Sequence, residues 1–234
     1  MLRALSLWCL GAASALEQAG AVRALRTSRR GALAGAATAA VVAAAPARAR
    51  AAAALGAERA GFKAGISKGS TPGYSTYRDT VLGTRGSKTV VNVEFEFPAD
   101  WTPLRDKLDL IDGSSGTVAN VLAVPLVGAQ LAALSKQFIA NAIFSPEGKI
   151  QKGGTPVDEF KVLALRDAGR PGYVELDLRY TAVSPNMRLI DRRALATATQ
   201  VGDSLYILFV SANAVKWDQQ KKNVEQTARS FVAS

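Results

Sequence analysis

Residues 204–212 read Ser-Leu-Tyr-Ile-Leu-Phe-Val-Ser-Ala, and this stretch decides the fold. Leu205–Val210 is apolar without a break, so a strand built from it cannot turn either face to water. Strands that are buried on both faces lie inside a sheet and are covered by further layers above and below. We therefore expect Leu205–Val210 to be a central strand of a layered domain.

The flanking sequence predicts the neighbouring strands. Arg192–Gln200 lies immediately upstream, across the turn Val201-Gly202-Asp203, and this spacing indicates a hairpin. Tyr173–Thr181 alternates strictly between apolar and polar residues, the pattern of a half-buried strand. A second hairpin is predicted around Asp112-Gly113-Ser114. The remaining predicted strands are Val91–Phe97, Lys107–Asp112, Thr117–Val124 and Phe160–Arg166.

Two segments have helical spacing. In 126–144 the apolar stripe is formed by Val127, Leu131, Leu134 and Phe138. Near the end of the chain a second stripe is formed by Trp217, Val224, Ala228 and Phe231. Antiparallel strands packed by at least two helices predict an α+β layered domain.

Histidine is absent, and the only cysteine is Cys9. Zinc sites built on thiolate or imidazole, disulfides, Cys–His nucleophiles and Ser–His–Asp triads therefore do not fit the rest of the chain. The absence of histidine also removes the side chain that most often transfers protons near neutral pH. These facts favour a protein that is not an enzyme.

The net charge of +10 is unevenly distributed. The first 50 residues contain seven arginines and one acid, so residues 51–234 carry only +4. This distribution argues against a nucleic-acid footprint on the domain.

The basic first fifth of the chain has the pattern of a multipartite targeting precursor. Leu2–Ala15 resembles a secretory signal, and Leu16–Ser28 is rich in Ala and Arg, as plastid transit stretches are. Arg29 and Arg30 then precede a mildly hydrophobic run that ends in a small-residue cleavage pattern at Ala47 and Ala49. An alanine-rich helix or linker is the structural alternative. The order of the signals predicts delivery to the plastid thylakoid lumen.

Composition then divides the chain into three parts. We interpret residues 1–50 as the targeting precursor, 51–89 as a flexible N-terminal arm and 90–234 as the folded domain. The arm is rich in Gly, Ser, Thr and basic residues and shows no clear period.

Several short sequence motifs of the domain, in this order, resemble the PsbP family of extrinsic photosystem II subunits. An aromatic strand leads into Pro-x-x-Trp, an Asn-Val strand ends at Pro, a strand pair contains Leu-Tyr, and a Trp opens a last helix that closes with Ser-Phe. These motifs are Phe95–Trp101, Asn120–Pro125, Ala196–Thr199 with Leu205–Ile207, and Trp217 with Ser230-Phe231.

The resemblance implies an α/β/α sandwich with a central, mainly antiparallel sheet. It implies peripheral binding to lumenal subunits of photosystem II on the thylakoid membrane, and a functional link to the Ca²⁺ and Cl⁻ of the oxygen-evolving complex. Two positions that can hold a His and an acid in the family correspond here to Arg193 and Ala214. The resemblance therefore assigns no metal ligand to this chain, and its metal sites stay open.

Candidate functional residues follow from charge and aromatic content. Trp101 and Trp217 are expected to be structural anchors in the core. Asp106, Asp109 and Asp112 cluster near a turn but lack EF-hand spacing, so a solvated hairpin end is favoured over a Ca²⁺ loop. Basic residues that could steer docking onto an acidic surface are Lys63, Lys68, Arg85, Lys88, Arg188, Arg192 and Arg193.

Three functions remain as alternatives. The first is a non-catalytic extrinsic subunit that stabilises the oxygen-evolving complex. The second is a PsbP-domain assembly or stability factor for a photosystem in the lumen. The third is a hydrolase acting through carboxylates, for which the sequence shows no motif.

Overall fold

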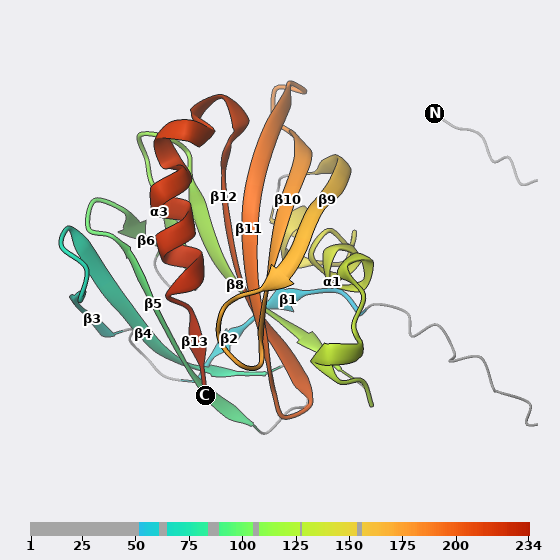
Figure 1. The fold of residues 1–234 in the computed structure, drawn as a ribbon. Coiled ribbons are helices and arrows are strands. Elements are labelled where there is room, and N and C mark those ends of the chain that lie inside the picture. The colour runs from blue at the N-terminus through green and yellow to red at the C-terminus, as the bar shows by residue number, and fades with distance from the viewer. Residues whose placement is uncertain (1–51, 61–64, 84–88, 105–107, 127, 154–155) are drawn as a thin grey trace, which may run out of the picture. The chain divides into compact units, whose positions relative to one another are not determined.

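The fold is described by a computed structural model over residues 52–60, 65–83, 89–104, 108–126, 128–153 and 156–234 (Figure 1). Its main sheet has eight strands, and every pairing within it is antiparallel. Across this sheet the order is β6 (Thr102–Pro103), β7 (Asp109–Ile111), β8 (Val118–Pro125), β12 (Ser204–Asn213), β11 (Leu189–Val201), β10 (Tyr173–Val183) and β9 (Val157–Asp167), and β1 (Leu55–Gly56) also pairs with β8.

The central strand β12 is buried on both faces. Leu205, Ile207 and Phe209 belong to one hydrophobic core, whereas the intervening Tyr206 and Leu208 belong to another. All of these side chains have 0% exposure. The predicted central strand is confirmed, as are the hairpins predicted around Val201-Gly202-Asp203 and Asp112-Gly113-Ser114.

One face of the main sheet packs against a second sheet and a long helix. The second sheet has the order β13 (Val232–Ala233), β5 (Val90–Pro98), β4 (Tyr74–Leu82) and β2 (Glu58–Arg59), with β3 (Gly65–Lys68) also paired to β4. The helix is α3 (Trp217–Arg229), which follows the 3-10 helix η2 (Ala214–Lys216) and contacts β5, β11 and β12. Figure 1 shows α3 lying across this face. Trp101 and Trp217, 3% and 5% exposed, lie in the core between these layers.

The opposite face of the main sheet carries the second core. It is covered by the 3-10 helix η1 (Leu131–Ala133), α1 (Lys136–Ile143) and α2 (Lys149–Lys152). Phe144 stacks on Phe160 and meets Phe209 edge-on in this core. The chain therefore has the predicted α+β class, with helices on both faces of a central antiparallel sheet. None of the described helices is both long enough and apolar enough to cross a bilayer.

The sequence prediction of a flexible arm over 51–89 is corrected by β4. This nine-residue strand pairs with β5 along its whole length, from Tyr74 opposite Pro98 to Leu82 opposite Val90. Its inward side chains are Tyr77, Asp79 and Val81. A buried aspartate in the middle of this set interrupts the apolar alternation, so the local pattern does not predict the strand.

Asp79 is stabilised in the core by two partners. Arg59 on β2 pairs with its Oδ2 at 2.6 Å, and the Tyr77 hydroxyl donates to the same oxygen at 3.0 Å. Burial raises the pKa of Tyr77 to about 12, so its hydroxyl stays protonated as a donor. This cluster joins β2 to β4.

The predicted helix over 126–144 is also corrected. Among its described residues the only α-helix is α1, which follows the 3-10 helix η1, and Ser135 caps α1 by accepting a hydrogen bond from Phe138 N at 3.1 Å. The buried face of α1 consists of Ile139, Ala140, Ala142 and Ile143. Of the predicted stripe, Leu131 and Leu134 precede α1 and Val127 lies outside the described residues.

A second carboxylate connects α3 to the smaller sheet. Glu96 on β5 accepts hydrogen bonds from the amide and hydroxyl groups of Ser70 and Thr71, and from Gln226 Nε2 on α3 at 2.9 Å. The hydrogen bonds from Ser70 and then Thr71 lower the pKa of Glu96 to about 2. Its charged form is therefore part of the folded structure.

The Asp79 cluster generates a stability prediction. We expect Arg59→Ala to lower the free energy of unfolding by about 3 kcal/mol, because it leaves a buried carboxylate without its cation. Arg78→Ala is the matched control. Arg78 lies on β4 next to Asp79, but its side chain is exposed and pairs with Glu94 of β5. That variant should cost much less stability, because solvent screens an exposed ion pair. Urea titrations measure the free energy of unfolding of both variants. Equally small decreases would contradict the role of Arg59 in holding β2 and β4 in the folded domain.

Glu96 generates a pH prediction. Because its folded pKa lies below the ordinary value of about 4.5, its charge stabilises the fold above that pH, and the stabilisation is lost as the pH falls toward 2. Glu96→Gln should therefore cost on the order of 1–3 kcal/mol at pH 7. The difference from the unmodified protein should shrink between pH 4.5 and 2. Glu94→Gln, on the exposed face, is the control, and a Glu96→Gln deficit that stays constant over this range would contradict the assignment.

Candidate functional site

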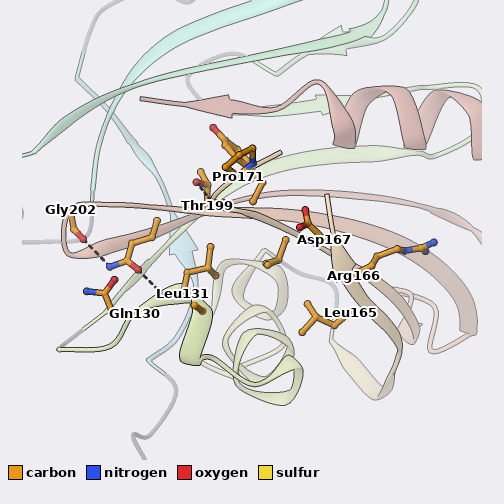
Figure 2. Close-up of a pocket in the computed structure, with 13 residues that line it drawn as sticks. Gln130, Leu131, Leu165, Arg166, Asp167, Pro171, Thr199 and Gly202 are labelled. Atoms are coloured by element: carbon orange, nitrogen blue, oxygen red, sulfur yellow. Dashed lines mark hydrogen bonds between the residues drawn. The ribbon is translucent and has the colours of Figure 1, made fainter. Parts of the chain in front are cut away.

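An open cleft lies where the turns β9–β10 and β11–β12 come together at one end of the main sheet (Figure 2). Its volume is about 930 Å³. The segment before and within η1 forms one wall, and the two turns form the other. Residues with side chains at the cleft are Gln130, Leu131, Leu165, Arg166, Asp167, Pro171, Tyr173, Val174, Thr199 and Gln200.

Gln200 holds the two walls together. Its Oε1 accepts from Leu131 N at 2.7 Å, and its Nε2 donates to Gly202 O at 3.1 Å (Figure 2). A weaker contact joins Nε2 to Ala129 O at 3.4 Å. One side chain at the end of β11 therefore fixes both its own turn and the loop that enters η1.

The β9–β10 turn is held by the C-terminal segment. Arg170 donates to Phe231 O at 2.7 Å, and its guanidinium lies 4.2 Å from the centre of the Tyr173 ring. The Tyr173 hydroxyl accepts from Ala233 N at 3.1 Å. Thr199 donates to Gly172 O at 2.9 Å and ties the same turn to β11. These contacts make the cleft a preformed surface.

The two charged side chains of the cleft are held by contacts within the domain. Its acid, Asp167, accepts from Gly169 N at 2.9 Å, and its base, Arg166, pairs with Glu175 and Asp177. Both charged groups are thus engaged in structural contacts. The cleft combines apolar side chains with amide and hydroxyl groups, which suits recognition of a protein surface.

The edge strand β9 extends the cleft with exposed leucines. Leu163 and Leu165 are 42% and 39% exposed. The register of β9 on β10 is shifted at Leu163, between the pairs Asp177–Ala164 and Leu178–Val162. A bulge of this kind discourages uncontrolled pairing of an edge strand with another chain. We therefore expect recognition here to use side chains rather than strand addition.

Beside α3, a network of alternating charges covers β9, β10 and β11. Glu175, whose side chain is 3% exposed, pairs with Arg166 at 3.2 Å and with Arg229 of α3 at 3.3 Å. Asp177 pairs with Arg193 at 3.2 Å, and the Arg193 guanidinium lies 4.5 Å from the centre of the Trp217 ring. The network attaches α3 to the main sheet at the margin of the hydrophobic core.

The predicted docking residues do not form one patch. Arg188 lies in the exposed β10–β11 turn, where its amide donates to Ser184 Oγ. Arg192 and Arg193 are consecutive on β11 and lie on opposite faces, one beside Tyr180 and Phe209 and the other on Trp217. Lys68 is exposed on β3. Lys63, Arg85 and Lys88 lie outside the described residues, as do Arg29, Arg30, Ala47 and Ala49.

The acidic cluster divides into separate structural roles. Asp109 pairs with Lys149 of α2. Asp112 accepts hydrogen bonds from Ser114 and Ser115 within its own turn, and Asp106 lies outside the described residues. Within the described ranges, no group of three or more acidic or cysteine side chains is arranged to hold a metal ion.

Sequence reasoning missed Gln200 and Glu175. Gln200 closes a predicted strand, and no local pattern reveals that its amide reaches a loop 69 residues away. Glu175 occupies the polar side of the strict alternation in 173–181, which predicted exposure. Only the packing of α3 on that side shows that it is buried.

The solved structures that the chain is similar to include two with low sequence identity. No family model and no curated protein matches the chain. Among solved structures, it is similar to cyanobacterial PsbP (CyanoP) from Synechocystis sp. PCC 6803, with 18% identity over 61% of this chain and 86% of that one, at a TM-score of 0.42. It is also similar to the Saccharomyces cerevisiae Ran-binding protein Mog1p, with 11% identity over 72% and 87%, at a TM-score of 0.30. The α+β class rests on the strand order and packing described above.

The role of Gln200 generates a dynamic prediction. Gln200→Ala removes the acceptor of the Leu131 amide, so hydrogen exchange at that amide should accelerate at least tenfold. The free energy of unfolding should fall by about 1 kcal/mol. Gln137→Ala on the exposed surface of α1 is the control for a glutamine substitution. Unchanged exchange at Leu131 would show that the cleft wall does not depend on Gln200.

Proposed function

We propose that this protein is a non-catalytic extrinsic subunit on the lumenal face of photosystem II, where it stabilises the oxygen-evolving complex and the retention of its Ca²⁺ and Cl⁻. The observation that carries the proposal is the conjunction of two independent sequence features. The targeting pattern of residues 1–50 is the kind that directs a chain to the thylakoid lumen. The ordered sequence motifs between Phe95 and Phe231 resemble a family that works in that compartment.

The geometry of the domain supports binding as its mode of action. The cleft held by Gln200 is open, preformed and bordered by the exposed Leu163 and Leu165. Its arginine is ion-paired, and its aspartate accepts a hydrogen bond from a backbone amide. A subunit of this kind acts by shape and charge complementarity and performs no bond-breaking step.

The net charge supports the same interpretation. Residues 51–234 carry +4, which favours approach to an acidic lumenal surface and makes the association sensitive to salt. Salt should therefore release the protein from membranes without detergent.

A second candidate is an assembly or stability factor for a photosystem, and it uses the same fold and address. The two functions differ in stoichiometry. A subunit matches the number of reaction centres, whereas a factor is scarce and binds immature complexes. A carboxylate hydrolase is disfavoured because the buried acids Asp79, Glu96 and Glu175 are all held in structural contacts.

The test is a quantitative salt wash of isolated thylakoids, with this protein and photosystem II cores counted by mass spectrometry. We expect release of about one copy per core and a fall in oxygen evolution that added Ca²⁺ and Cl⁻ restore. Release far below one copy per core, with oxygen evolution intact, would replace this proposal with the assembly factor.

A rebinding experiment locates the docking surface. Purified protein with Leu163→Asp and Leu165→Asp should rebind washed membranes at least tenfold more weakly than the unmodified protein. Val215→Asp is the matched control, because Val215 is 91% exposed and lies on η2, away from β9. Equal rebinding of all three proteins would exclude the β9 edge as the contact surface.

A further inference from the structure

A second cavity lies on the face of the main sheet that α2 covers. Its volume is about 610 Å³. Tyr180 and Phe209 supply aromatic surface from the sheet, and Leu55, Leu104, Leu110 and Ile150 supply aliphatic surface around it. A cavity of this size, largely apolar with a few polar groups, has the character of a small-molecule or peptide-terminus site.

The cations of this cavity differ in their partners. Lys149 pairs with Asp109, and Lys152 pairs with Glu147 at 2.7 Å on the exposed rim. Arg192 has no carboxylate within 4.0 Å among the residues that the structure describes. The lining therefore carries one net positive charge, centred on Arg192.

The guanidinium of Arg192 is only partly satisfied. Its Nη2 donates to Gly116 O at 2.9 Å and to Ser211 O and Oγ at 3.1 and 3.2 Å. All three acceptors are neutral. Its Nε is shielded from solvent and has no hydrogen-bond partner in the described part of the chain.

An arginine in this state favours an anion. A guanidinium without a counter-ion in a largely apolar cavity is costly, and a shielded N–H without an acceptor adds to that cost. A carboxylate matches the planar fork of a guanidinium and can accept two parallel hydrogen bonds. An apolar group attached to that carboxylate could pack on the Tyr180 and Phe209 rings.

We propose that this cavity binds an apolar carboxylate, with Arg192 as the anchor for the carboxylate and Tyr180 and Phe209 as the surface for the apolar group. Two sources share this chemistry, namely a free small carboxylic acid and the C-terminus of a peptide that ends in an apolar residue. The site lies on different residues from the Gln200 cleft, so its failure would leave the proposed docking function untouched.

The first experiment uses N-acetyl-L-phenylalanine and its amide as probes of the unmodified protein. We expect the acid to bind at least tenfold more tightly than the amide, since only the acid offers a charged acceptor. In ¹⁵N spectra, the Nε resonance of Arg192 should shift with the acid and stay unchanged with the amide. Equal affinities, or an unmoved Nε resonance, would overturn the proposal.

Two variants separate binding from folding. Arg192→Lys keeps the charge but loses the fork, and should reduce the affinity for the acid at least tenfold. Ser211→Ala removes one neutral acceptor of Arg192 and retains the guanidinium, so the preference for acid over amide should persist. Thermal unfolding establishes that each variant is folded. Loss of the preference in Ser211→Ala with retention in Arg192→Lys would contradict the anchoring role.

The source of the ligand is decided with a tetrapeptide, acetyl-Gly-Gly-Gly-Phe, as free acid and as amide. Binding of the peptide acid as tight as that of N-acetyl-L-phenylalanine assigns the site to a chain terminus. Binding of the small acid alone assigns it to a free carboxylate. Failure of both acids to bind overturns the proposal.

Discussion

The burial of β12 on both faces is the constraint on which the other layers depend. An apolar strand with no side for water needs a partner strand on each edge and a covering layer on each face. Here β8 and β11 occupy the edges, α1 covers one face, and α3 with the smaller sheet covers the other. Strand β4 belongs to the smaller sheet, where it pairs with β5. This pairing explains why residues 74–82, which have no clear apolar period, are an integral part of the domain.

Buried carboxylates mark the junctions between these layers. Asp79 joins β4 to β2, Glu96 joins β5 to α3, Glu175 joins the β9–β10 pair to α3, and Asp109 joins β7 to α2. Each of these acids receives a cation or several donors, as burial of a charge requires. Arg192 is the contrasting case, since it lines a cavity with a shielded Nε and has no acid within 4.0 Å among the described residues. The difference between a completed junction and an incomplete one is the physical basis for assigning that cavity a ligand.

Periodicity predicted the strands whose faces are chemically distinct. The alternation in 91–97 and 173–181 and the apolar run 205–210 all became strands with the expected faces buried. Prediction failed where long-range partners change the meaning of a residue. Asp79 interrupts an apolar alternation, and its burial depends on Arg59 and Tyr77, which lie beside it. The apolar spacing in 126–144 predicts one helix, whereas the α-helix begins only after Ser135. The cleft depends on contacts such as Gln200 with Leu131, which no local pattern encodes.

The direction of the strongest pKa changes bears on the kind of function that this fold performs. Catalytic acids and bases are tuned toward the working pH. Here the hydrogen bonds from Ser70 and Thr71 take the pKa of Glu96 down to about 2, and burial takes that of Tyr77 up to about 12. Both changes fix one protonation state across the neutral range, and the chain contains no histidine to counter them. Such tuning stabilises the folded scaffold, which is compatible with the proposal that the protein acts by presenting a surface.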